Sequence, residues 1–480
     1  MKRITFKAIL FLLALPGIAA AQATRVDELR YPALPAFDIP RPERVVLDNG
    51  MVVMLLEDHE LPLVEATALI RNGSVYDPAD KIGLAEVAAE VMRTGGTQSM
   101  AGDALDEWLE NRAASIEVAA GRDSVRAVLS SLKADFPEAL RVFADVLRRP
   151  AFDAAKLEVA RTQAVTEVAR QNDDPNSIVF REFGKLVYGP DSPYARTETF
   201  ATLNAIRRED LVAWHAAALH PDRVILGLVG DFKKDEALAR IRQVFGDWRR
   251  GPALQTAAAP YRKEPNPGVF QVAKEDVTQS FIMMGHLGVR KDDPDFHALE
   301  VLNQLLSGSF AARLFSEVRT RKGLAYAVSG YVDSDWGHPA LAQMFVSTKT
   351  ETTGAAIDAL LEEARALMSS RPPTEEEVRK ARQGLLNSFV FSFDSLQKVL
   401  NRQLTLEYYG YPPDWTAKYR AGIEAVTVEQ VRKAARHLRP EEFSILVVGT
   451  PQGLDKPLTT YGKVTPLDVT LPPLPSQDGM

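Results

Sequence analysis

Histidine, the side chain that most often binds catalytic metals or moves protons near neutral pH, occurs seven times in this chain of 480 residues. No two of the seven stand at the i, i+4 spacing that places two imidazoles on one face of a helix for a metal ion. His297 and Glu300 have the spacing of the first part of an H-x-x-E-H pattern, but Val301 stands where the second histidine would be. The histidines are His59, His215, His220, His286, His297, His338 and His437.

Other common catalytic signatures are absent from the sequence. It contains no G-x-S-x-G, P-loop or G-x-G-x-x-G pattern, so nucleophile-elbow hydrolases and nucleotide-binding enzymes have no support. The chain has no cysteine, which excludes disulfides, thiolate zinc sites, iron–sulfur clusters and cysteine nucleophiles. A net charge of -7 argues against nucleic-acid binding, because neutralising phosphates needs a surplus of Lys and Arg.

The first 23 residues are typical of an export signal. Lys2, Arg3 and Lys7 precede a short apolar stretch, and a small-residue cleavage site follows between Ala21 and Ala23. The apolar stretch is too short to span a bilayer, and no later run reaches about 18 apolar residues. We therefore expect a soluble protein that is periplasmic or otherwise exported and has no membrane span after signal removal.

The mature chain contains an internal duplication. Residues 219–230, LHPDRVILGLVG, recur as residues 438–449, LRPEEFSILVVG, at an offset of 219. Tyr188-Gly189 recurs as Tyr409-Gly410 at an offset of 221, as expected for duplication followed by small insertions. The segment 249–268 carries four prolines and no apolar periodicity, which is typical of a linker between the two halves.

The elements that must position any site follow the same order in both halves. Asp48-Asn49-Gly50 between apolar runs predicts a hairpin, and residues 63–71 predict a third strand. Helical patterns follow at Gly83–Arg93, Ala104–Ala114, Val125–Leu147 and Ala154–Gln171. The second half has a strand pattern in QSFIMMGHLGV, helices at 294–306, 354–369 and 374–392, and a terminal strand in SILVVG.

These patterns predict an α+β fold of two homologous sandwich halves, each a mainly antiparallel sheet with helices packed on one side. The expected organisation is a signal peptide (1–23), an N-terminal domain (24–248), a linker (249–268), a C-terminal domain (269–456) and a Pro-rich, extended or disordered tail (457–480).

Two blocks of sequence carry a resemblance to a known family. The stretch NGMVVMLLEDHELPLVEATALIRNGS, followed by GLAEVAAEVMRTGGT, resembles the opening of the pitrilysin/insulinase-type, or inverzincin, zinc metallopeptidases, with one extra glycine before the closing Gly-Thr. The block LLSGSFAARLFSEVRTRKGLAYAVSG at 305–330 resembles the family's Gly-rich loop and R-x-x-x-G-L-A-Y element. The resemblance covers nearly the whole mature chain, including its duplication, and implies two halves in a clamshell arrangement.

The zinc motif of the family is degenerate in this chain. Glu86 and Glu90 occupy the two histidine positions, Ala89 replaces the general base, and Glu167 matches the distal ligand. The resemblance therefore implies no zinc in this chain and no cofactor of its own. Three carboxylates suit Ca²⁺ or Mg²⁺, so a hard cation is one interpretation of Glu86, Glu90 and Glu167. The other interpretation is that the glutamates simply face solvent.

The other half of the family's site is retained. The resemblance implies that Arg319 and Tyr326, seven residues apart, bind substrate backbone and stabilise an oxyanion in the active site of a partner. Ser307-Gly308-Ser309 would let a peptide backbone approach closely, or would form a plain helix-ending turn. The leading interpretation is an exported pseudopeptidase subunit that binds peptide and pairs with a zinc-bearing paralogue. The alternative is a structural or peptide-binding scaffold protein without a role in proteolysis.

Overall fold

The first half of the chain builds a six-stranded sheet in the order β1-β2-β8-β3-β7-β6. In this computed structural model, which describes residues 39–252 and 259–473, all neighbours in the sheet are antiparallel except β2 and β8. The strands are β1 (Glu43–Val46), β2 (Val52–Glu57), β3 (Leu63–Ile70), β6 (Ser115–Ala120), β7 (Val125–Leu132) and β8 (Val224–Gly230). The predicted hairpin is confirmed, since Val46 pairs with Val52 and Gly50 takes a φ of +89° in the turn.

Helices from the same half cover one face of this sheet. Their apolar residues share one hydrophobic core with strand residues such as Leu226 and Leu228. These helices are α1 (Leu84–Thr94), α2 (Gly102–Glu110), α3 (Phe136–Arg148), α4 (Ala154–Arg170), α6 (Phe200–Ala205), α7 (Arg208–Ala218) and α8 (Lys234–Phe245). A short ribbon of β4 (Gly96–Thr97) and β5 (Met100–Ala101) follows α1.

The second half repeats this plan in a sheet of order β12-β14-β10-β15-β9-β16. Its strands are β9 (Gly268–Ala273), β10 (Gln279–Leu287), β12 (Ala327–Val332), β14 (Leu341–Lys349), β15 (Ser444–Gly449) and β16 (Val464–Pro466), beside a short pair of β11 (Val289–Arg290) and β13 (Ser334–Asp335). The helices are α9 (Phe296–Ser307), α10 (Thr353–Ala366), α11 (Glu375–Phe389), α12 (Leu396–Tyr409), α13 (Trp415–Ala425) and α14 (Val428–Ala434). The predicted fold of two homologous α/β halves is confirmed.

Five strands of the two sheets correspond one to one, and the sixth does not. The order β2-β8-β3-β7-β6 matches β9-β15-β10-β14-β12. The remaining edge is β1, antiparallel to its neighbour, in the first sheet, but β16, parallel to its neighbour, in the second. The C-terminal segment therefore completes the second sheet, although the sequence predicts it to be extended or disordered.

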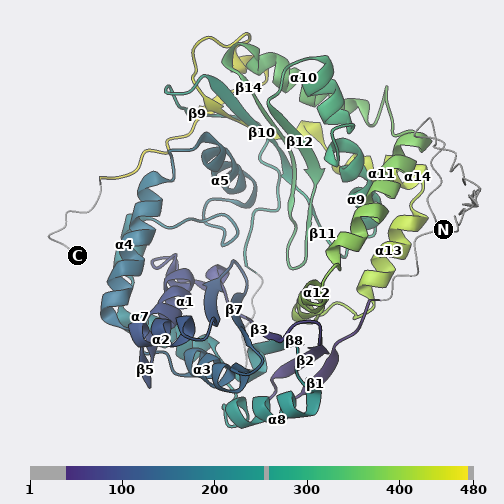
Figure 1. Ribbon diagram of the computed structural model, residues 1–480. Helices are drawn as coiled ribbons and strands as arrows, with labels where there is room; N and C mark the ends of the chain where they lie inside the picture. The colour runs from purple at the N-terminus through teal and green to yellow at the C-terminus, as the bar shows by residue number, and fades with distance from the viewer. Residues whose placement is uncertain (1–38, 253–258, 474–480) are drawn as a thin grey trace, which may run out of the picture. The chain divides into compact units, whose positions relative to one another are not determined.

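One helix of each half packs against the sheet of the other half. Helix α5 (Pro175–Tyr188) belongs to the first half by sequence, yet Ile178, Val179 and Phe183 pack with Leu446 and Val448 of β15 in the second sheet. Helix α12 in turn packs against β8 of the first sheet, as Figure 1 shows. Besides its own helices on one face, each sheet therefore has a helix of the other half on the opposite face, which explains why β8 and β15 are buried on both faces.

One predicted helix is wrong over part of its length. Residues 125–132 form strand β7, whose alternate residues Val125, Ala127 and Leu129 are fully buried. The helix begins only at Phe136. The period-two pattern of β7 runs directly into the helical pattern of α3, and the two together imitate one long helix.

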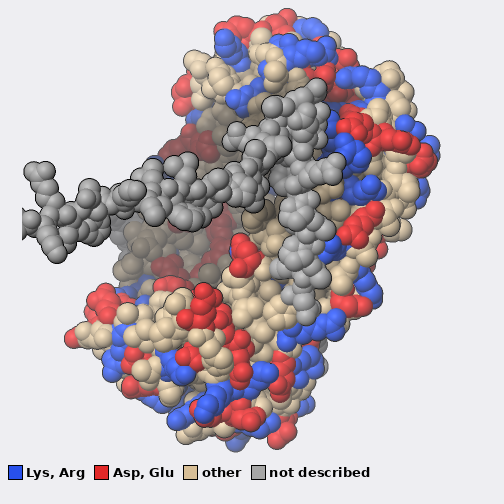
Figure 2. All heavy atoms as spheres, turned by 45° about the vertical axis from the view of Figure 1, so that its right-hand side comes forward, with Lys and Arg blue, Asp and Glu red and all other residues tan. Residues whose placement is uncertain are grey.

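Two further features concern export and charge. The predicted export signal lies outside the described residues, and within those residues no helix is both long and apolar enough to cross a membrane. On the face seen in Figure 2, acidic and basic side chains are interspersed.

Candidate functional site

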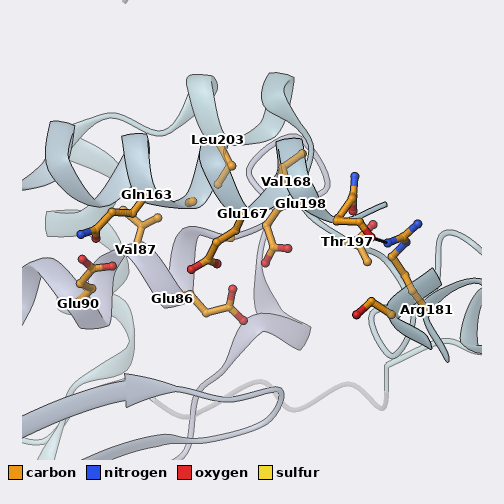
Figure 3. A pocket seen from close by; sticks show the side chains of 14 residues that line it. Glu86, Val87, Glu90, Gln163, Glu167, Val168, Arg181, Thr197, Glu198 and Leu203 are labelled. Carbon is orange, nitrogen blue, oxygen red and sulfur yellow. Dashed lines mark hydrogen bonds between the residues drawn. The ribbon is translucent and has the colours of Figure 1, made fainter. Parts of the chain in front are cut away.

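A cavity of about 780 Å³ lies between α1, α4 and the segment that precedes α6. Four glutamates line it: Glu86 and Glu90 from α1, Glu167 from α4, and Glu198 just before α6 (Figure 3). The structure thus brings the three glutamates singled out from the sequence to one cavity and adds a fourth. None of the four forms an ion pair with a described residue, and carboxyl groups outnumber the one cation of the lining, Arg181.

Helix α1 presents its two glutamates to the cavity through its register. Glu86 and Glu90 are one turn apart and share a face, as i and i+4 residues do. Ala89 is 0% exposed, belongs to the hydrophobic core and does not line the cavity. Asp77 anchors the start of the helix, since its carboxylate accepts the backbone N–H groups of Gly83 and Ala85 at 3.0 and 3.1 Å.

The crowding of carboxyl groups changes their acidity. Glu86 keeps contact with solvent inside the wide cavity, but the surrounding protein and a hydrogen bond to the Glu198 carboxyl raise the pKa of Glu86. That hydrogen bond requires one of the two carboxyls to carry a proton. Burial and the charge of Glu167 raise the pKa of Glu90, and burial raises the pKa of Asp77 to about 7.

The raised pKa of Glu86 predicts a pH-dependent stability. The folded chain holds this proton more tightly than the unfolded chain, so its contribution is complete below the ordinary pKa of 4.5 and is lost as pH rises through the folded value. Glu86→Gln keeps a hydrogen-bond donor toward Glu198 and has no proton to lose. We expect its melting temperature to exceed that of the wild type at pH 8, and by less at pH 5. Glu107→Gln, at an exposed position of α2, should show no such trend; equal effects at both pH values would contradict the prediction.

The donor set does not fit a metal ion. Among the described residues, the only group of three or more carboxylates or imidazoles whose ligand atoms all lie within 4.8 Å is Asp293, Asp295 and His437, which lies elsewhere. The family's zinc site would require two imidazoles where Glu86 and Glu90 stand, and a base where Ala89 is packed in the core. The hard-cation interpretation of Glu86, Glu90 and Glu167 gains no support from this geometry.

Two residues of the cavity were missed in the sequence. Glu198 lies on a loop 31 positions after Glu167, and no local pattern marks it. Arg181 comes from α5, the helix lent to the other sheet; it donates to Glu182, to Asn172 and to the Gln171 carbonyl. A search for a motif of fixed spacing cannot find either residue, because both come close to α1 only in the folded chain.

The retained pair, Arg319 and Tyr326, lies outside this cavity. Arg319 lies in a π-helical turn (Phe315–Arg321), and its guanidinium lies over the Phe315 ring at 4.6 Å. Tyr326 precedes β12 and is 55% exposed. Neither side chain forms a hydrogen bond or ion pair with a described residue, so both are free to contact another molecule.

The two serines of the Gly-rich loop before this pair already form hydrogen bonds within the chain. The Ser307 hydroxyl accepts the Gly330 N–H at 2.6 Å and donates to the Gly330 carbonyl, which ties the end of α9 to β12. A Cβ at Gly308 would meet the Gln304 side chain at 2.1 Å. Ser309 accepts the Ala311 N–H and leaves Phe310 80% exposed. The loop thus presents an apolar tip rather than a polar one.

Comparisons with known proteins agree with this geometry. The family description "Insulinase (Peptidase family M16)" matches residues 52–189, and "Peptidase M16 inactive domain" matches residues 205–385. A Helicobacter pylori protein described as "Non-peptidase homolog YmxG" is 24% identical over 82% of this chain and 91% of its own length. The Bacillus subtilis "Uncharacterized zinc protease YmxG" is 23% identical over 86% of this chain and 98% of its own length.

Solved structures show the same fold. The crystal structure of a peptidase M16 inactive domain from Pseudomonas fluorescens is 25% identical, with a TM-score of 0.77 over 87% of this chain and all of that one. A protease structure from Helicobacter pylori has a TM-score of 0.73 over 85% of this chain and all of that one. The two matched descriptions together cover residues 52–189 and 205–385, which include the degenerate α1 motif and the Arg319/Tyr326 element. The chain therefore belongs to the M16, or insulinase, family of peptidases.

Proposed function

We propose that this chain is an exported pseudopeptidase subunit that binds peptide and pairs with a zinc-bearing paralogue. In this proposal Arg319 and Tyr326 act in the partner's active site, where a guanidinium and a phenol can donate to a developing oxyanion. The observation that carries the proposal is the contrast between the two elements. The zinc element has lost both histidines and its base, whereas the Arg/Tyr element keeps two exposed donors that form no hydrogen bond or ion pair with a described residue.

The four-glutamate cavity supports a binding role in place of catalysis. Ala89 cannot accept a proton, so water activation has no base at this position. A cavity of about 780 Å³ lined by four glutamates that form no ion pair with a described residue is suited to the basic side chains of a peptide. The Helicobacter pylori relative, described as a non-peptidase homologue, favours the same interpretation.

The scaffold function remains the second candidate, and one experiment separates the two. This chain and an intact H-x-x-E-H paralogue from the same organism are purified separately and mixed, and cleavage of an unfolded peptide is followed. We expect the mixture to cleave far faster than the paralogue alone. A stable complex with no gain in cleavage would favour the scaffold.

The purified chain alone is expected to hold no stoichiometric zinc and to cleave no unfolded peptide. Two of the three ligand positions and the base position carry other residues, and the cavity glutamates do not converge on a point. Elemental analysis after dialysis tests this, with the paralogue measured in parallel as a positive control. A reading of about one zinc per chain, as structural and catalytic sites give, would contradict the prediction.

A further inference from the structure

A second cavity, of about 150 Å³, occupies the position in the second half that the four-glutamate cavity occupies in the first. The first cavity is lined by α1, α4 and residues at α6; the second is lined by α9, α11 and α13, the corresponding elements. On α11, Leu385, Ser388 and Phe389 line it, each 221 positions after the α4 residues that line the first. We call it the C-terminal cavity.

The exchanged helices give each cavity one arginine at the same place. Arg402 of α12 stands 221 positions after Arg181 of α5. Arg181 is satisfied by hydrogen bonds to its own neighbourhood, including Glu182 at 2.8 Å. Arg402 forms no hydrogen bond or ion pair with a described residue, although it is half-buried. The same position therefore holds a hydrogen-bonded arginine in the first half. In the second half it holds an arginine that forms no hydrogen bond or ion pair with a described residue.

A second cation accompanies Arg402. Lys291, just after β11, lies with its Nζ 5.1 Å from the centre of the Trp336 ring, and the Arg402 guanidinium lies 5.9 Å from the same ring. Among the described residues, the side-chain ammonium of Lys291 donates only to the Ser334 hydroxyl, at 3.3 Å, and it forms no ion pair. Burial lowers the pKa of both cations, which is the unfavourable situation that a bound anion relieves.

Aromatic residues make up five of the twelve that line the C-terminal cavity. Phe296, Phe389, Phe393, Trp415 and Tyr419 line it. The one carboxylate in the lining, that of Glu300, already accepts the Tyr419 hydroxyl at 3.1 Å, and neighbouring Asp333 is not part of the lining.

Thr416 adds an unused polar group to this lining. It is 5% exposed, and its hydroxyl has no hydrogen-bond partner among the described residues. The lining thus combines aromatic rings, a buried hydroxyl and two cations against one carboxylate, while Asp333 and Asp335 lie near Lys291 outside the lining.

We propose that the C-terminal cavity binds a small monocarboxylate with a ring-sized apolar group, independently of the peptidase-related function above. The carboxylate pairs with Lys291 and Arg402, and the apolar group lies among the aromatic rings. An apolar cavity of about 150 Å³ in a protein core holds one benzene molecule, so the volume suits a single ring. Free aromatic acids and peptides that end in phenylalanine share this chemistry.

The test uses the full chain and two matched probes, phenylacetate and its neutral amide, phenylacetamide, with calorimetry at pH 7. We expect the acid to bind at least about tenfold more tightly than the amide, because a carboxylate forms stronger, charge-assisted hydrogen bonds with the two cations than a neutral amide does. An acetylated dipeptide ending in phenylalanine, compared with its C-terminal amide, identifies which source the site accepts. Equal binding of acid and amide, or no saturation by phenylacetate, would overturn the proposal.

Variants place the ligand in the cavity. Arg402→Gln and, separately, Lys291→Met should each weaken phenylacetate binding by about tenfold or more, since each removes one charged donor. Lys418→Gln, on the exposed side of α13, is the matched control and should bind as the wild type does. Melting curves check that each variant folds. The ratio of acid to amide affinity in the wild type tests the proposal independently of any variant. Unchanged binding in both cavity variants would show that the acid binds elsewhere.

Discussion

A complex reconstituted with Tyr326→Phe is expected to form with the affinity of the wild type and to turn over peptide about a hundred to a thousand times more slowly. The substitution removes a hydroxyl and leaves the ring in place. A donor aimed at an oxyanion contributes most where the negative charge is fully developed, so its loss lowers kcat more than it weakens assembly. The measurement is steady-state cleavage at saturating subunit, together with the affinity of the two subunits.

The exposed position of Tyr326 makes this test clean. Its side chain is 55% exposed and hydrogen-bonds to no described residue, so the folded chain should tolerate the change. Tyr76→Phe, at another exposed tyrosine, is the matched control and should leave turnover unchanged. If Tyr326→Phe also left turnover unchanged, Arg319 and Tyr326 would be structural and the scaffold function would be favoured.

Phe183→Ala is expected to lower the free energy of unfolding of the whole chain by about 3–5 kcal/mol. Phe183 is 1% exposed. It lies on α5, a helix that belongs to the first half by sequence but packs against the sheet of the second half. Its loss leaves a hole against β15, and the surrounding rigid strands cannot close it completely. Urea denaturation followed by circular dichroism measures the effect.

An exposed phenylalanine gives the control. Phe391 is 67% exposed, so Phe391→Ala should change the free energy of unfolding by no more than about 0.5 kcal/mol, as surface substitutions do. Because α5 joins the two halves, we also expect one unfolding transition in the wild type. Two separate transitions, with Phe183→Ala shifting only the first half, would contradict the packing described here.

Much of the fold could be predicted because its signals are local. The Asn49-Gly50 turn, the apolar run of β15 and the duplicated Tyr-Gly pairs are short patterns with one physical meaning each. The matched pairs Tyr188-Gly189 and Tyr409-Gly410 turn out to mark the ends of α5 and α12, the two exchanged helices. The sequence does not predict strand β7, because its alternation runs into the next helix, or β16, because its three residues, the last of them a proline, carry no pattern of their own.

The residues of the candidate site could likewise be predicted only where a local pattern marks them. Glu86, Glu90 and Glu167 were found because they occupy a motif with fixed spacing. Glu198 was not found, since it reaches the cavity from a loop. The exchange of α5 and α12 has no sequence signal either, because an amphipathic helix does not encode which sheet it will cover.

The exchanged helices also bear on how such a chain arose. A fragment that ended after residue 248 would keep α5 without the sheet it covers, and would expose the face of β8 on which α12 lies. Two copies of that fragment could each place α5 on the other's sheet and so repair both faces at once, as in a domain-swapped dimer. The two-half chain is then a tethered version of such a homodimer. A tethered chain, unlike a homodimer, can carry different residues at its two equivalent cavities, and here one is lined by four glutamates and the other by aromatic rings and two cations.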